Sequence, residues 1–205
     1  MQSIFGEGFF LDLFLIIFFT GWIFRAYFGR KSPDYKKSLA ELKRQPLQNE
    51  SPLSFALQAT FGLVLLVAFI FYVSRSTMFS WMQLPLPLIV RWIGVVVGLI
   101  SLPIMGWVQR TLGASFSKTL IIQKDHKLVT TGPYSRVRHP MYSSHTFWFL
   151  SWFLISTNLL FGISWILWLA YVVVRIPQEE RMLIEKFGEE YEEYMKRTGS
   201  LFPTL

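Results

Sequence analysis

The sequence predicts an all-α protein, a polytopic membrane helical bundle of five spans with a cytoplasmic C-terminal helix. Two observations lead to this class. Hydrophobic residues make up 52% of the 205-residue chain and charged residues only 16%, against about 25% charged residues in an ordinary soluble domain. The mean hydropathy is +0.39, and several uncharged runs approach the length of about 20 residues that a membrane span needs.

Three runs have the length of single spans, at residues 9–24, 51–74 and 92–109. The first run has no basic residue before it and no clear cleavage site after it. We therefore expect it to stay in the protein as a span rather than to be removed as a signal peptide. Arg25 follows this run directly, and its long side chain is expected to snorkel to the membrane surface.

A fourth run, residues 141–174, is 34 residues long and uncharged. As one helix it would measure about 51 Å, whereas the hydrocarbon core is about 30 Å thick. Ser156, Thr157 and Asn158 near its middle suit a turn. The run therefore predicts two short helices in a hairpin.

The basic residues support this hairpin. Of the 20 Lys and Arg residues, seven lie in residues 25–50, six in 110–138 and five in 175–205. Basic loops stay in the cytoplasm, so both flanks of the fourth run are expected on the same side and the run must cross twice. The N-terminus is then outside and the C-terminus inside.

The connecting segments have patterns of their own. Residues 35–43 suggest a short amphipathic helix, and residues 120–125 a short extended stretch. Pro85 and Pro87 suggest an external turn within residues 74–87.

The chain changes character after Pro177, where apolar residues recur at helical spacing. Pro177 suits the first turn of a helix, and Glu179 and Glu180 suit its positive end. We expect a cytoplasmic amphipathic helix over residues 177–198 that rests on the bundle or the membrane surface. The residues of its apolar stripe are Leu183, Ile184, Phe187, Tyr191 and Tyr194.

Composition excludes several classes of site. The chain has no cysteine, which excludes disulfides, thiolate zinc sites and cysteine nucleophiles. Its three histidines are 13 and 6 residues apart, a poor metal signature, so we expect no metal. The net charge of +7 is explained by the cytoplasmic loops, and we expect no nucleic acid partner.

Polar residues gather in two segments, 126–142 and 175–180, and the hairpin is expected to bring them together at the cytoplasmic face. Gly132-Pro133 marks a turn, and His139 precedes a proline and should be extended. Backbone N–H and C=O groups that are not used in a helix are available for hydrogen bonds to the edge of an adenine ring. These features predict a cytoplasmic cofactor pocket.

Simpler interpretations exist for the individual residues. Arg136 and Arg138 are also explained as ligands of lipid phosphates, and Glu179 with Glu180 as helix capping alone. His126 fits an exposed loop, and His145 fits an internal hydrogen bond better than catalysis.

Three motifs resemble the isoprenylcysteine carboxyl methyltransferase family. They are His-x-Leu-Val-x-x-Gly-x-Tyr at 126–134, Arg-His-Pro-x-Tyr at 138–142, and Glu-Glu-x-x-Leu-Ile-x-x-Phe-Gly-Glu-Glu-Tyr-x-x-Tyr at 179–194. The resemblance covers roughly residues 88–205 and looks closest to the compact prokaryotic members with five spans. It implies one membrane domain, residues 1–205, with N-terminal spans and a basic loop in 1–87 and a methyltransferase-like catalytic part in 88–205.

The resemblance also implies an activity. The chain would be an S-adenosylmethionine-dependent methyltransferase of a prokaryotic cell membrane, acting by carboxyl O-methylation on a prenylcysteine-like, lipophilic substrate among the membrane lipids. Arg175 matches the position that faces the reacting end of the substrate, and either Leu120 or Ile121 would add one cofactor contact. The cofactor-binding residues by position would be His126, Lys127, Leu128, Val129, Tyr134, His139, Pro140, Met141, Tyr142 and Glu179.

Other functions stay open at this point. The acceptor of the methyl group could be a lipid amine or thiol. The motifs are partly shared with NADPH-dependent reductases of sterol-like lipids, although those enzymes are usually longer. A non-enzymatic basic scaffold that binds anionic lipid is the third reading.

Overall fold

A computed structural model describes residues 6–31, 51–75, 77–112 and 128–204. The described residues form helices and no β-strand beyond two isolated bridges, which confirms the all-α prediction. Two 3-10 helices, Thr77–Met82 and Gly132–Ser135, lie in the connections. The α-helices are α1 (Glu7–Lys31), α3 (Pro52–Val73), α4 (Leu88–Leu112), α5 (Pro140–Ser156), α6 (Leu159–Phe187) and α7 (Glu189–Lys196).

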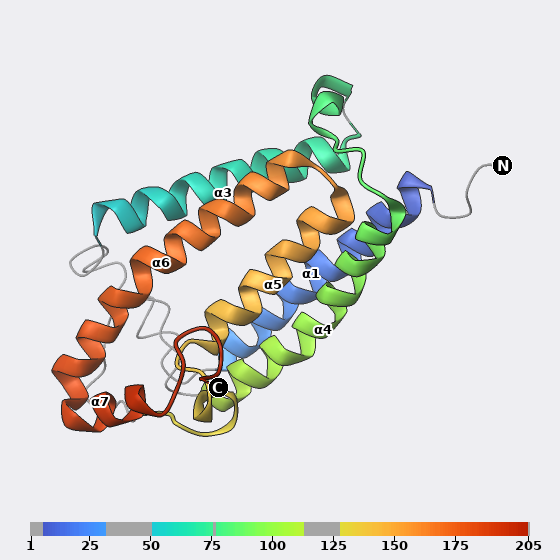
Figure 1. The fold of residues 1–205 in the computed structure, drawn as a ribbon. Helices are drawn as coiled ribbons and strands as arrows, with labels where there is room; N and C mark the ends of the chain where they lie inside the picture. The colour runs from blue at the N-terminus through green and yellow to red at the C-terminus, as the bar shows by residue number, and fades with distance from the viewer. Residues whose placement is uncertain (1–5, 32–50, 76, 113–127, 205) are drawn as a thin grey trace.

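The long helices form a bundle in which α1, α4 and α5 lie side by side and α3 runs along α6 (Figure 1). Four of them, α1, α3, α4 and α6, are long and apolar enough to cross a membrane. Large apolar side chains such as Leu63 and Ile166 point outward and are more than half exposed, as expected for a lipid-facing surface. The chain is therefore a multi-pass membrane protein. Helix α5 has 17 residues and spans about 25 Å, so its crossing of the bilayer stays a prediction.

The predicted hairpin is present. Helix α5 ends at Thr157, which adopts the left-handed conformation with φ of 50°. The side chain of Asn158 then accepts a hydrogen bond from the backbone of Leu160 at 2.9 Å and begins α6. The segment with the predicted external turn lies against this hairpin turn, because the Leu84 N–H donates to the Thr157 carbonyl at 2.8 Å.

Helices α4 and α5 approach closely at a glycine. A Cβ atom on Gly94 would lie 2.7 Å from Cβ of Leu154 and 2.8 Å from the backbone nitrogen of Ile155. Gly98, four residues on, faces Ile17 of α1 and Ser151 of α5 in the same way. Small residues at this spacing let helix backbones meet in a membrane bundle. They hold α5, and therefore the start of the polar site, against α4.

The predicted helix over residues 177–198 is wrong in its start and its continuity. Helix α6 passes through Pro177 and ends at Gly188, and α7 follows. A proline inside a helix removes one backbone hydrogen bond, and beside it the Gln178 side chain donates to the Val174 carbonyl and to the Ser51 hydroxyl, both at 2.9 Å. Gln178 thereby ties α6 to the start of α3. The expected helix at 35–43 and extended stretch at 120–125 lie outside the described residues.

Candidate active site

The hairpin brings the two polar segments together. Tyr142 on α5 donates its hydroxyl hydrogen to Oε2 of Glu179 on α6, at 2.8 Å. Nε2 of His139, the residue before α5, lies 3.2 Å from Oε1 of Glu180. Residues 37 and 41 positions apart in sequence are therefore in direct contact. The ring of Tyr142 also lies 6.0 Å from the ring of Trp168 on α6.

Arg138 has a structural role that sequence reasoning missed. Its Nε donates to Oε1 of Glu180 at 2.9 Å, and its Nη1 donates to the carbonyls of Met195 and Thr198. Next to it, the backbone N–H of His139 donates to the Ser200 carbonyl at 3.0 Å. Arg138 therefore fastens the C-terminal segment to the hairpin.

Two of the simpler interpretations are thereby corrected. Arg138 is engaged inside the protein, so the lipid-phosphate reading fails for it, whereas Arg136 is exposed. Glu179 and Glu180 lie far inside the continuous helix α6, so they do not cap a helix. The ion pair between Arg138 and Glu180 could have been suspected from their opposite charges, but nothing in the sequence indicated that these two residues pair with each other.

Tyr134 is buried in the 3-10 helix before α5, and its carbonyl accepts a hydrogen bond from the Tyr194 hydroxyl of α7 at 2.5 Å. Burial raises the pKa of Tyr194 to about 12, so this phenol stays protonated and acts as the donor. The contact holds the 3-10 helix against α7. Tyr134 therefore contributes at least its backbone to this end of the bundle.

The structure describes some of the other predicted site residues and leaves others out. Leu128 and Val129 are half-buried in the segment before the 3-10 helix. Met141 accepts, through its carbonyl, a hydrogen bond from Nδ1 of His145 at 2.7 Å. His126, Lys127, Leu120 and Ile121 lie outside the described residues.

Arg175 lies on α6, one turn before Glu179, and is only 4% exposed. Since α6 is continuous here, the two side chains lie on one face, as predicted. Arg175 also acts electrostatically on Tyr142, which already contacts Glu179. A cation, a carboxylate and a phenol are therefore gathered between α5 and α6.

Arg25 departs from its expected position. Instead of snorkelling, it turns inward, and its Nη1 lies 3.0 Å from Nε2 of His145. His145 is 3% exposed, so the interpretation of this histidine as an internal hydrogen-bonding residue is confirmed.

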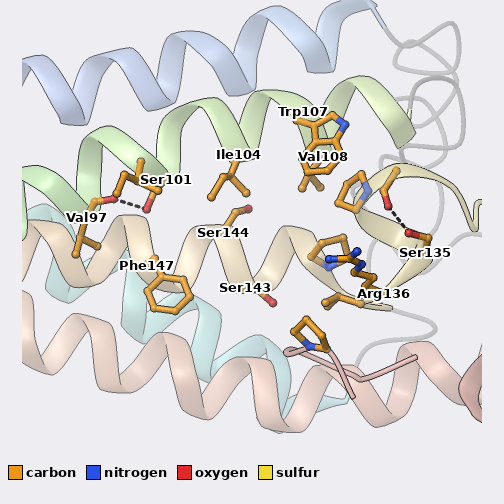
Figure 2. Close-up of a pocket in the computed structure, with 16 residues that line it drawn as sticks. Val97, Ser101, Ile104, Trp107, Val108, Ser135, Arg136, Ser143, Ser144 and Phe147 are labelled. Atoms are coloured by element: carbon orange, nitrogen blue, oxygen red, sulfur yellow. Dashed lines mark hydrogen bonds between the residues drawn. The ribbon is translucent and has the colours of Figure 1, made fainter. Parts of the chain in front are cut away.

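A cavity of about 680 Å³ lies between α4, α5, the 3-10 helix and the C-terminal tail (Figure 2). Its serine hydroxyls are bonded to backbone carbonyls, Ser101 to Val97 at 2.7 Å and Ser144 to Met141 at 2.9 Å. The wall is consequently mostly apolar, with Arg136 as a charged lining residue. Pro140 and Ser144 line the cavity on the face of α5 opposite to Tyr142. Of the predicted cofactor residues that the structure describes, only Pro140 contributes to this cavity.

The fold and these contacts define a multi-pass helical membrane protein with a polar junction at one end of its bundle. Residues 92–185 match the model of the isoprenylcysteine carboxyl methyltransferase (ICMT) family. The chain is a relative of that family, which confirms the resemblance that the sequence motifs indicated.

Individual relatives agree. The protein-S-isoprenylcysteine O-methyltransferase of Dictyostelium discoideum is 30% identical over 156 residues, which is 71% of this chain and 61% of the relative. The human protein-S-isoprenylcysteine O-methyltransferase is 35% identical over 99 residues, 46% of this chain and 34% of the relative. The chain thus spans about three fifths of the Dictyostelium relative's length and about one third of the human one.

A solved structure shares the fold. The eukaryotic intramembrane Ras methyltransferase ICMT superimposes with a TM-score of 0.53 and 24% sequence identity, over 93% of this chain and 67% of that one. At this identity the likeness concerns the fold alone.

Proposed function

We propose that the chain is an integral-membrane methyltransferase that uses S-adenosylmethionine to methylate the carboxylate of a lipophilic, prenylcysteine-like acceptor. The contact of Tyr142 with Glu179 at 2.8 Å carries the proposal, because it joins the Arg-His-Pro-x-Tyr motif to the Glu-Glu motif at one point. The names of the relatives, protein-S-isoprenylcysteine O-methyltransferase, support the same reaction.

The residues at the junction fit a cationic cofactor that carries hydroxyl groups. Glu179 accepts from Tyr142 with one oxygen, and its other oxygen has no hydrogen bond to the described residues, so it is available to a ligand hydroxyl or ammonium group. The Tyr142 ring has the ring of His139 at 5.8 Å and that of Trp168 at 6.0 Å. Aromatic faces beside a carboxylate attract a cation.

S-adenosylmethionine, when bound, supplies an activated methyl group. In our proposal Glu179, Tyr142 and the segment around Leu128 and Val129 hold and orient it. Arg175 holds the acceptor carboxylate with a two-pronged hydrogen bond. Since a carboxylate is ionised at neutral pH, no residue has to remove a proton, and the site contributes mainly by positioning.

A carboxylate acceptor suits these contacts better than an amine, which has to lose a proton. His139, the first histidine to consider as a base, is engaged with Glu180. We further propose that the junction faces the cytoplasm of a prokaryotic cell membrane and that the acceptor enters from the bilayer. The five-span topology with the N-terminus outside belongs to the same proposal.

The direct test uses purified protein in nanodiscs of neutral lipid, S-adenosylmethionine with a labelled methyl group, and an S-prenylcysteine acid. We expect label in a base-labile ester, and none with the matched carboxamide, which lacks the nucleophile. Label in a lipid amine or thiol, or consumption of NADPH in place of methyl transfer, would contradict the proposal.

A further inference from the structure

Arg25 lies in the last turn of the candidate span of α1, three residues before its end at Phe28. A long cationic side chain at such a position ordinarily reaches to the membrane surface. The guanidinium does not reach away from the bundle but points to α5, where Nη1 lies 3.0 Å from Nε2 of His145. The proposed function as argued above leaves this residue without a role.

Among the described residues, the hydrogen-bond partner of Arg25 is His145, which does not compensate its charge. Nδ1 of His145 carries the proton, because it donates to the Met141 carbonyl at 2.7 Å. Nε2 therefore carries the lone pair that accepts from the guanidinium, and the imidazole is neutral. A neutral acceptor satisfies one of the five N–H groups of arginine and none of its charge.

No carboxylate among the described residues forms a hydrogen bond or ion pair with Arg25. The groups that act on it electrostatically are the phenols of Tyr171 and Tyr142. Arg25 is only partly buried, so a ligand can reach it. The missing component at this position is an anion.

The same phenol connects Arg25 with the proposed reaction site. Tyr142 interacts electrostatically with Arg25 and with Arg175, and it donates its hydroxyl hydrogen to Glu179. The ring of Trp168 lies 5.9 Å from the ring of His145, which contacts Arg25, and 6.0 Å from the ring of Tyr142, so the two contacts adjoin each other. An anion bound between the two contacts would be attracted by both guanidinium groups.

A second polar group, on α4, belongs to the same end of the bundle. α4 packs on α1 where Gly106 faces Phe24 and Phe28. Within the next turn of α4, the amide of Gln109 is buried, and neither its oxygen nor its nitrogen has a hydrogen bond to the described residues. A buried amide needs a polar partner, and a polar ligand that reaches Arg25 from the side of α4 would supply one for Gln109.

We propose that Arg25 binds the anionic group of the methyl acceptor together with Arg175, so that the first helix supplies part of acceptor recognition. This assignment rests on the proposed function and adds to it a residue outside the motifs. It has a consequence for turnover. Methylation removes the negative charge, the ester no longer neutralises the two arginines, and the product is released into the bilayer.

The test compares binding of an S-prenylcysteine acid and of its methyl ester to protein in nanodiscs of neutral phosphatidylcholine. The wild type is expected to prefer the acid. In Arg25→Gln the affinity for the acid falls about 10-fold or more, as for one lost charge-assisted hydrogen bond, while the affinity for the ester changes less than about twofold. Arg110→Gln is the matched control, because Arg110 is an exposed cation near the same end of the bundle, stacked on Phe28.

Thermal unfolding separates ligand binding from a structural role. Without acid, Arg25→Gln is expected to melt no lower than the wild type, since no carboxylate of the described residues pairs with Arg25, and the acid is expected to raise the melting temperature of the wild type more than that of the variant. If Arg25→Gln does not fold, Arg25→Lys decides, because it keeps the charge and loses the planar fork. At least a threefold loss of acid affinity is then expected, and full retention would overturn the proposal.

Three further results would overturn it. In the first, Arg25→Gln keeps the full preference for the acid while S-adenosylhomocysteine still binds, which removes the role of Arg25 and leaves the proposed function intact. In the second, the effect of the substitution appears only in nanodiscs with anionic lipid, which assigns Arg25 to a lipid headgroup. In the third, the wild type binds no S-adenosylhomocysteine, which overturns the proposed function and the identity of the anion together.

Discussion

The Glu180 carboxylate has two partners on the neighbouring segment, the guanidinium of Arg138 at 2.9 Å and the imidazole of His139 at 3.2 Å. Replacing it by glutamine leaves the mostly buried guanidinium of Arg138 without its charge partner. We predict that Glu180→Gln lowers the free energy of unfolding by about 1–3 kcal/mol, measured by denaturant titration in one detergent. Glu193→Gln, at an exposed position of α7, should change it little. Equal stability of the two variants would show that the contacts of Glu180 with Arg138 and His139 do not stabilise the fold.

Arg175 is assigned to the acceptor and not to the cofactor. Arg175→Lys keeps the charge but loses the two-pronged geometry, so we predict a lower rate of methyl transfer at saturating acceptor. The affinity for S-adenosylhomocysteine should change less than about threefold, which is under 1 kcal/mol. Single-turnover methylation and calorimetry on the same preparation test both parts. Normal turnover in Arg175→Lys would rule out bidentate binding, and normal turnover in Arg175→Ala would show that Arg175 does not bind the acceptor.

The sequence allowed some of these residues to be predicted and not others. Tyr142 and Glu179 could be placed together because motif and hairpin pointed to the same junction. Arg25 could not, since a span with few polar residues, Glu7–Phe28, does not reveal which way its one long cationic side chain turns. His145 completed that contact from 120 positions away, a distance at which spacing carries no information.

At the level of helices, the close approach of α4 and α5 at Gly94 positions α5. A methyl group there would lie 2.8 Å from a backbone nitrogen of Ile155, which cannot move by itself. We predict that Gly94→Ala lowers the free energy of unfolding by about 1–3 kcal/mol. Gly62→Ala in α3 is the matched control, because nothing lies within 4 Å of the added atom. Thermal unfolding that is the same in both variants would contradict this packing.

The hairpin and the last long helix show what periodicity can predict. The turn at Thr157 was predictable because one helix of 34 residues does not fit a bilayer and because three turn-forming residues stood in its middle. The break expected at Pro177 was wrong, since contacts of Gln178 with Val174 and Ser51 hold the chain helical on both sides of the proline. Such tertiary contacts are not visible in a local pattern.

For the whole molecule, the orientation in the membrane is predicted by the distribution of basic residues along the chain. The distribution of basic residues predicts that the end of the bundle with Ser80 faces outside and the end with Glu193 faces the cytoplasm. The chain has no cysteine, so Ser80→Cys and Glu193→Cys, both at exposed positions, each introduce a single thiol. An impermeant thiol reagent applied to intact cells should label the first variant only. Labelling of Glu193→Cys from outside would contradict the orientation.

The central claim is that the junction of Tyr142 and Glu179 binds a cofactor of the S-adenosylmethionine type, and calorimetric titration with S-adenosylhomocysteine tests it most directly. We predict binding by the wild type, no binding of NADPH, and an affinity about 10- to 150-fold weaker in Glu179→Gln, as for one lost charge-assisted hydrogen bond of about 1.5–3 kcal/mol. Glu185→Gln, an exposed position on the same helix, should bind like the wild type. Equal affinity in Glu179→Gln and Glu185→Gln, or no binding by a folded wild type, would contradict the account.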